Sequence, residues 1–340
     1  MGNTLKFKPA WWLNHAHLQT LYPALLRKTP PLPLRRERLI TPDNDFIDLD
    51  YCGTDDTAPL IILLHGLTGS SQSSYIKGLQ WILLQQGFRS VVLNFRGCSG
   101  EYNRLARCYH SGETEDIHFV YQTLRHREPT TPFAAIGFSL GGNVLLKWLG
   151  EQGNQIELFA AVAVSVPLVL SMCASKLDKG FSRLYRANLL RELKDYVREK
   201  QQHLEKLGAA GEAEKIKQLG DLSSIHSFWQ YDDCVVAKLH GFKNAHDYYQ
   251  RSSSRQFLKT ITVPTLLIQS LDDPFMTSEV LPCSTELSSV IQLEITQGGG
   301  HVGFVTGKNP FKPVYWLEKR ILEFLFQSVS ANSLAKNKSQ

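Results

Sequence analysis

The sequence predicts an α/β fold with a mostly parallel central sheet, helices on both faces and an inserted helical cap. From residue 38 onward, short apolar runs alternate with segments of helical periodicity. The alternation stops between residues 168 and 258, where no buried-strand run occurs, and then resumes. Strands alternating with helices imply right-handed crossovers and a parallel sheet, so the interruption predicts an insertion into that sheet.

Composition and charge exclude several other classes of protein. Of the 340 residues, 43% are hydrophobic and 20% are charged, which is typical of a globular chain with a full core. The formal net charge of +5 is spread along the chain, apart from Arg35, Arg36 and Arg38. Nucleic-acid binding needs a clustered basic surface, so no nucleic-acid partner is expected.

The cysteines and the apolar runs indicate in which cell compartment the protein is expected. None of the six cysteines forms a CxxC pair, the spacing of many zinc and redox motifs. The longest apolar run, Leu158–Leu170, contains a proline and is shorter than the roughly 20 residues that span a bilayer. Lys6 and Lys8 precede only a short apolar patch, so no signal peptide is recognised. We therefore expect a cytoplasmic protein with free thiols.

Residues 1–37 are expected to form an N-terminal arm. Its apolar anchors are Trp11, Trp12, Leu18, Leu21 and Tyr22. Tryptophan commonly anchors a surface segment, so we expect the arm to pack against the domain. Transient contact with a membrane surface or lipid is the alternative.

The core is expected at residues 38–167 and 259–328. Its first part is predicted to contain strands at 46–52, 60–64, 90–95, 133–138 and 158–164, and helices at 75–86, 113–127 and 140–149. The run 46–52 alternates apolar and polar residues, as a half-exposed strand does. The run 60–64 (LIILL) is continuously apolar, as expected of a strand covered on both faces.

The second part of the chain begins with the predicted cap at 168–258. Within it, a helical stripe is formed by Leu189, Leu193, Val197, Leu204 and Leu207. Strands are predicted again at 263–269 and 290–295, and a helix at 314–326 closes the core. The polar residues 329–340 predict a flexible tail.

The strongest functional signal is the sequence GFSLG at 137–141. A GxSxG pattern is weak alone, but here an apolar strand precedes it and an apolar-striped helix follows it directly. That setting is typical of the nucleophile elbow of the α/β-hydrolase fold, in which Ser139 would stand on a sharp, strained turn. A Cβ at position 137 or 141 would strike the neighbouring strand or helix. The sequence therefore predicts a serine nucleophile at position 139.

A serine hydroxyl needs a base, and the base needs a third group that orients it. In this fold the order along the chain is serine, then an acid after a late strand, then histidine after the last strand. Asp272 and Asp273 follow one predicted strand, and His301 follows the next within GGGHVG. Asp273 is favoured over Asp272 because it directly precedes Pro274 and an apolar residue. The three glycines are expected to free the backbone so that His301 can swing over the sheet.

The oxyanion formed during acyl transfer needs two N–H donors. The backbone amides of Leu140 and of Leu67, in the loop 64–69 (LHGLTG), are predicted to supply them. Four side chains are predicted to line the substrate pocket: His65, Trp229, Tyr231 and Phe242.

No cofactor or metal is expected. The sequence contains neither a phosphate-binding GxxxxGK[ST] motif nor an HExxH zinc motif, and a serine triad needs neither. The Asp232–Asp233 pair and the acids at 113–116 are more simply read as helix caps or solvated charges.

At these residues the chain resembles the YheT-like branch of the α/β-hydrolase fold family. The matching segments are HLQT at 17–20, LLHGLTGS at 64–71, NFRG at 94–97, YHSGETED at 109–116, GFSLGGN at 137–143, YDD at 231–233, DYY at 247–249, DDPF at 272–275 and GGGHVGF at 298–304. The resemblance covers about residues 10–328 and implies the triad Ser139, Asp273 and His301. Members of this broad family are described as carboxylesterases, acylglycerol or phospholipid lipases and ester synthases. The sequence shows no counterpart of the membrane anchor of animal relatives, so their membrane-lipid substrates are not expected.

Residues and resemblance together predict a serine hydrolase that cleaves small carboxylic esters of short- to medium-chain acids through an acyl-enzyme. The same triad would serve an acyltransferase, with an alcohol in place of water, or a thioesterase that prefers acyl-CoA. A non-catalytic binding protein would be expected to lose a triad position. Dehalogenases and epoxide hydrolases are excluded by a serine at the elbow.

Overall fold

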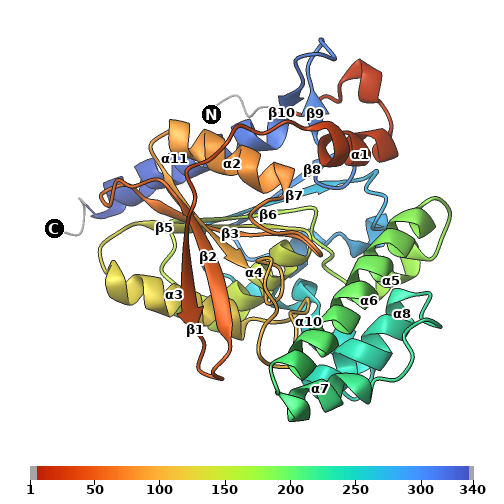
Figure 1. Cartoon of the computed structure of the whole chain (residues 1–340). Coiled ribbons are helices and arrows are strands. Elements are labelled where there is room, and N and C mark those ends of the chain that lie inside the picture. The colour runs from red at the N-terminus through yellow and green to blue at the C-terminus, as the bar shows by residue number, and fades with distance from the viewer. Residues whose placement is uncertain (1–5, 337–340) are drawn as a thin grey trace.

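The computed structural model describes residues 6–336, with side chains through residue 330. In this part of the chain the main sheet has eight strands, in the order β1-β2-β4-β3-β5-β6-β7-β8 (Figure 1). The strands are β1 (Arg35–Ile40), β2 (Phe46–Cys52), β3 (Leu60–Leu64), β4 (Arg89–Asn94), β5 (Phe133–Phe138), β6 (Ala160–Val164), β7 (Thr265–Ser270) and β8 (Ile291–Thr296). β2 runs antiparallel to β1 and β4, and the other pairs are parallel, which confirms the predicted fold class.

Helices cover both faces of the sheet (Figure 1). One face packs against α2 (Ser74–Gln85) and α11 (Trp316–Lys336), and the other packs against α3 (Glu115–Arg127) and α4 (Leu140–Gln152). Alternate residues of each strand serve the two layers: Ile61 and Leu63 contact the first pair of helices, whereas Leu60 and Ile62 contact the second. Continuous apolar strands are therefore required here, as the LIILL run predicted.

The strand β2 differs from the prediction of a half-exposed strand, because all of its residues are buried. Its aspartates are covered by β1, which was not predicted as a strand. β1 contains the basic cluster Arg35, Arg36 and Arg38 and begins within the predicted arm. Arg38 lies opposite Asp48 in the ladder, and Arg36 lies opposite Asp50. Each arginine makes two hydrogen bonds of 2.7–2.8 Å to its aspartate. Paired guanidinium groups make the burial of carboxylates tolerable, and an alternating pattern alone does not reveal such pairing.

Several helices lie between β6 and β7, within the predicted cap segment. They are α5 (Leu170–Leu177), α6 (Ser182–Lys206), α7 (Ala210–Lys217), α8 (Phe228–Tyr231), α9 (Lys238–His240) and α10 (Ala245–Ser252), with a π-helical segment at Asp232–Ala237. We call residues 170–252 the helical insertion; it sits to one side of the sheet (Figure 1). Of the predicted stripe, Leu193, Val197 and Leu204 are buried, but Leu207 at the end of α6 is 58% exposed.

The arm packs against the domain through α1 (Ala16–Leu26) and a short 3₁₀ turn, Trp11–Leu13. Its buried anchors are Ala10 and Leu13, which contact Val305 in the small ribbon β9 (Val305–Thr306) and β10 (Val314–Tyr315). Two predicted anchors, Trp11 and Leu18, are instead 72% and 49% exposed. Residues 1–5 of the arm lie outside the described residues.

The C-terminal helix α11 continues to Lys336, ten residues beyond its predicted end. Ser328 and Ser330 lie in this extension, and their hydroxyls donate hydrogen bonds to the carbonyls of Phe324 and Phe326 one turn earlier. Residues 329–336 are therefore helical rather than tail, and residues 337–340 lie outside the described residues. None of the helices described here combines the length and the apolar character needed to cross a membrane.

Candidate active site

Ser139 stands on a strained turn between β5 and α4, as predicted. Its φ and ψ angles are +51° and −119°, a region that residues with a side chain rarely occupy. The glycines around it allow close packing. A Cβ on Gly137 would collide with the Gly141 backbone, and a Cβ on Gly141 would collide with the carbonyls of Leu64 and His65. The strained turn directs the serine side chain into a cavity beyond the sheet.

The structure brings Ser139, His301 and Asp273 together in one chain of hydrogen bonds. The distance from Ser139 Oγ to His301 Nε2 is 2.9 Å, and from His301 Nδ1 to Asp273 Oδ2 it is 2.8 Å. The Asp273 side chain is only 2% exposed, and its second oxygen accepts a hydrogen bond from the Phe275 amide. When Nδ1 donates to the carboxylate, Nε2 is free to accept the serine proton.

The neighbouring Asp272 has a different role in the geometry. Its Oδ1 accepts hydrogen bonds from the Gly300 amide, at 2.9 Å, and from the Ser270 hydroxyl. It therefore fixes the loop that carries His301, whereas Asp273 holds the imidazole itself. This agrees with the preference for Asp273 and with the loop role expected of Asp272.

The loop after β3 presents the Leu67 amide beside the serine. Its neighbours are both pinned: the Gly66 amide donates to Tyr75 Oη and the Thr68 amide to Tyr109 Oη, each at 2.8 Å. Among the described residues, neither the Leu67 nor the Leu140 amide donates a hydrogen bond, and both residues line the cavity. A Cβ on Gly66 would lie 3.3 Å from Ser139 Cβ, so this loop approaches the serine closely. Free N–H groups at the cavity wall are what the predicted oxyanion hole requires, and that role stays a prediction.

The HLQT segment of the arm holds the His301 loop, a contribution that the sequence analysis missed. Thr20 Oγ1 accepts a hydrogen bond of 2.9 Å from the His301 amide. Gln19 brackets Val305: its Oε1 accepts from the Val305 amide at 2.7 Å, and its Nε2 donates to the Val305 carbonyl at 2.9 Å. A Cβ on Gly300 or Gly303 would collide with α1. The absence of a side chain at these two glycines therefore allows α1 to pack against the loop. Only backbone freedom was predicted for Gly300 from the sequence.

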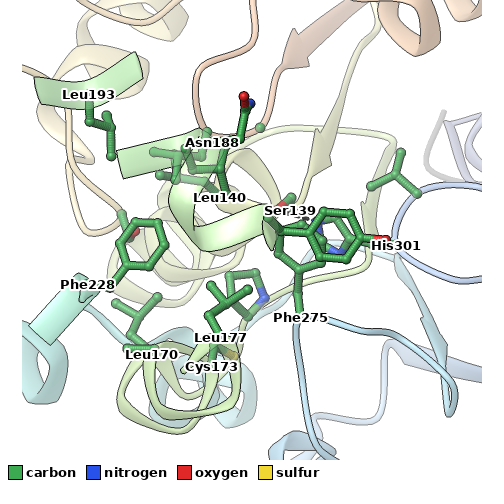
Figure 2. Close-up of a pocket in the computed structure, with 18 of the residues that line it drawn as sticks. Ser139, Leu140, Leu170, Cys173, Leu177, Asn188, Leu193, Phe228, Phe275 and His301 are labelled. Carbon is green, nitrogen blue, oxygen red and sulfur yellow. Dashed lines mark hydrogen bonds between the residues drawn. The ribbon is translucent and has the colours of Figure 1, made fainter. Parts of the chain in front are cut away.

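An aromatic ring packs directly against the His301 imidazole (Figure 2). Phe275 stacks on His301, with ring centroids 4.1 Å apart and an interplanar angle of 18°. Tyr185 of α6 packs on Phe275, and its hydroxyl lies 3.0 Å from Nδ1 of His17 in the arm. The arm and the helical insertion therefore meet over the histidine.

The cavity beside Ser139 has a volume of about 660 Å³. Much of its lining is apolar, and a large share of it comes from the helical insertion, including Leu170, Leu177, Leu193 and Phe228, which Figure 2 labels. Arm residues Leu21 and Leu25 complete one side.

The structure corrects three of the pocket predictions. Tyr231 lines the cavity, but His65, Trp229 and Phe242 do not. His65 is fully buried beneath its loop, where Nδ1 donates to the Gly66 carbonyl and burial lowers its pKa to about 4. Trp229 packs on Tyr249 and donates to Ser175 Oγ, while Phe242 packs on the rings of His110 and Tyr248. Aromatic residues in a helical segment serve its own packing as readily as a pocket, and sequence does not separate the two.

One group among the described residues could offer a metal ion three ligand atoms. These atoms belong to His110, Glu113 and His240 and lie within 4.8 Å of one another. The Glu113 carboxylate already pairs with Arg107. Burial lowers the pKa of both imidazoles, and positive charges that include Arg107 lower it further. That positive field disfavours a cation between them.

Comparisons with known proteins identify the family of the chain. A family model described as the alpha/beta hydrolase fold matches residues 59–308. "Putative esterase YheT" of Escherichia coli (strain K12) is 38% identical over 335 residues, covering 98% of this chain and 96% of that protein. "Phospholipase ABHD3" of Homo sapiens is 31% identical over 323 residues, covering 92% and 76%.

A solved structure shares the fold at low sequence identity. The esterase Pf2001 of Pyrococcus furiosus matches with a TM-score of 0.54 at 15% identity, covering 96% of this chain and 99% of that one. The family model and the two relatives, by contrast, match the amino-acid sequence over most of this chain. The chain therefore belongs to the α/β-hydrolase fold family, in its YheT-like branch.

Proposed function

We propose that the protein is a serine hydrolase that cleaves carboxylic esters through an acyl-enzyme. The observation that carries the proposal is the hydrogen-bonded chain Ser139–His301–Asp273, set at the wall of an apolar cavity. The relatives named as an esterase and a phospholipase support the same reaction class.

In this proposal the Ser139 oxygen attacks the ester carbonyl while His301 Nε2 takes its proton. The tetrahedral oxyanion is held by the Leu67 and Leu140 amides, which have no other acceptor among the described residues. His301 then protonates the leaving alcohol, and water, deprotonated by the same imidazole, releases the acid. Asp273 keeps the imidazole in the required tautomer and stabilises its positive form.

The cavity supports an acyl group of short to medium length. Its apolar lining favours hydrocarbon, and its volume of about 660 Å³ falls within the range of small-molecule pockets.

The test is hydrolysis of p-nitrophenyl esters with acyl chains of two to twelve carbons. We expect a maximum in kcat/KM within this series, set by the length that fills the cavity. Added alcohol should yield little transesterified product, and acyl-CoA should react more slowly than the matched oxygen ester. Dominant ester formation from the alcohol would instead identify an acyltransferase, and faster acyl-CoA cleavage a thioesterase.

The proposal includes transient contact with lipid at the cavity mouth. Leu25 of α1, Phe181 directly before α6 and Leu184 of α6 line the cavity and are 74%, 48% and 60% exposed. The basic residues Lys28 and Arg183 are exposed within three residues of these side chains. Exposed apolar groups flanked by positive charge favour an anionic lipid surface.

A further inference from the structure

A buried carboxyl lines the cavity without a charged partner. Asp232 begins the π-helical segment, is 8% exposed and belongs to the cavity wall. Its Oδ2 accepts a hydrogen bond of 2.6 Å from Tyr249 Oη. Among the described residues, no lysine, arginine or histidine lies within ion-pair distance of it. The adjacent Asp233 is different, because it accepts from the Ala245 amide and serves the start of α10.

This carboxyl is costly to bury. Burial raises the pKa of Asp232 to about 7, although the Tyr249 hydroxyl favours the ionised form. A hydrogen bond from one tyrosine does not compensate a buried carboxylate, which normally needs a cation or several donors. The missing partner is therefore expected to come from what enters the cavity.

The surroundings of Asp232 suit a positively charged group. Phe228, Tyr231 and Tyr248 line the same cavity, and ring faces attract cations. Lys200 and Arg107 have other partners, since Lys200 Nζ donates to the Arg107 carbonyl and Arg107 pairs with Glu113. A carboxylate among aromatic rings is the usual chemistry of ammonium recognition.

We propose that Asp232 and three aromatic side chains that line the same cavity, Phe228, Tyr231 and Tyr248, form a subsite for a quaternary ammonium group on the alcohol part of the ester. The inference rests on the proposed ester hydrolysis. The carboxylate supplies the charge complement, and the rings replace the water that the ammonium group loses.

The experiment compares a choline ester with the 3,3-dimethylbutyl ester of the same acid at pH 8. The two alcohols have the same shape, but only choline is charged. We expect native protein to favour the choline ester at least tenfold in kcat/KM, and Asp232→Asn to bring the ratio of the two values close to one. Asp233→Asn is the matched control and should keep the native ratio.

A binding measurement separates this inference from the proposed hydrolysis. Calorimetry of native protein with choline and with 3,3-dimethylbutan-1-ol needs no turnover. If native protein binds choline but not 3,3-dimethylbutan-1-ol, and Asp232→Asn no longer binds choline, the subsite is supported even if neither ester is cleaved. Equal kcat/KM values for the two esters, or no preference for choline when neither is cleaved, would overturn it.

Discussion

The adjacent residues Asp273 and Asp272 contact different parts of the His301 loop. Asp273 contacts the His301 imidazole, whereas Asp272 contacts the backbone of the loop that carries it. Only the first contact selects the tautomer of the base, so the two carboxyl groups should differ sharply in their effect on rate.

Substitution by asparagine tests this difference. We expect Asp273→Asn to lower kcat for ester hydrolysis by about three to four orders of magnitude, because an amide can donate to Nδ1 and favour the wrong tautomer. Asp272→Asn retains an acceptor for the Gly300 amide and should lose less than about tenfold. A larger loss in Asp272→Asn than in Asp273→Asn would mean that the acid has been assigned to the wrong residue.

Asp232 should make stability depend on pH. In an unfolded chain the pKa of an aspartate is about 4. In the folded protein, burial raises the pKa of Asp232 to about 7. The unfolded state therefore releases this proton first, so native protein loses stability as pH rises from about 4 to 7, and the loss then levels off.

The matching variant is Asp232→Asn, which does not titrate. Its free energy of unfolding relative to native protein should increase by roughly 2–3 kcal/mol between pH 5 and pH 8. Denaturant unfolding at the two pH values measures this difference. A difference that stays constant with pH would show that Asp232 keeps an ordinary pKa.

Among the elements, helix α1 contacts the loop that carries His301 although the two lie far apart in the sequence. Thr20 accepts a hydrogen bond from the His301 amide across a separation of 281 positions along the chain. Rate depends steeply on the position of a catalytic base, so this contact should affect turnover more than substrate binding. Thr20 is a positioning residue in this account.

Thr20→Val removes the acceptor while nearly preserving shape. It leaves the His301 amide without a partner, which costs about 1–3 kcal/mol if the loop does not move. We expect kcat to fall roughly 10- to 100-fold with little change in KM. Thr20→Ser restores the hydroxyl and should recover most of the rate. If serine fails to rescue, or if KM alone changes, the positioning role is refuted.

The elements also show what the sequence could predict. The core strands and helices were recognisable because buried parallel strands must be continuously apolar, and the elbow was recognisable because its glycines avoid backbone collisions. β1 and the burial of β2 depend on arginine–aspartate pairs between strands. The role of Gln19 depends on contact with Val305 far along the chain. Such pairings have no local pattern that would reveal them.

The site shows the same division. Ser139, Asp273 and His301 follow strands whose carboxyl ends share one edge of the sheet, so the chain order alone was informative. Part of the cavity wall comes from the helical insertion, where each aromatic residue can face either the cavity or its own core. The apolar character of that wall could be predicted, but of its predicted side chains only Tyr231 lines it.

For the whole molecule, the cavity mouth lies between the arm and the helical insertion. Leu25 and Leu184 stand on opposite elements there, and both are well exposed. Leu207 is similarly exposed, but it lies at the far end of α6, about 35 Å from Leu184 by helix length. This leucine provides a control with the same chemistry in another place.

Cosedimentation with anionic vesicles tests lipid contact at the mouth. We expect native protein to bind vesicles of phosphatidylglycerol, and Leu25→Asp and Leu184→Asp each to weaken binding about tenfold through lost apolar burial and added repulsion. Leu207→Asp should bind as the native protein does. Equal weakening by all three substitutions, or no vesicle binding by native protein, would argue against a lipid-facing mouth.

The central claim is that Ser139 is the nucleophile of an ester hydrolase. The most direct measurement is labelling with a fluorophosphonate probe, followed by peptide mapping, in native protein and in Ser139→Ala, alongside p-nitrophenyl ester hydrolysis. We expect one labelled residue, Ser139, and loss of both labelling and turnover in the variant. Ester turnover that persists in Ser139→Ala, or a native protein that neither takes the label nor cleaves any ester of the series, would contradict it.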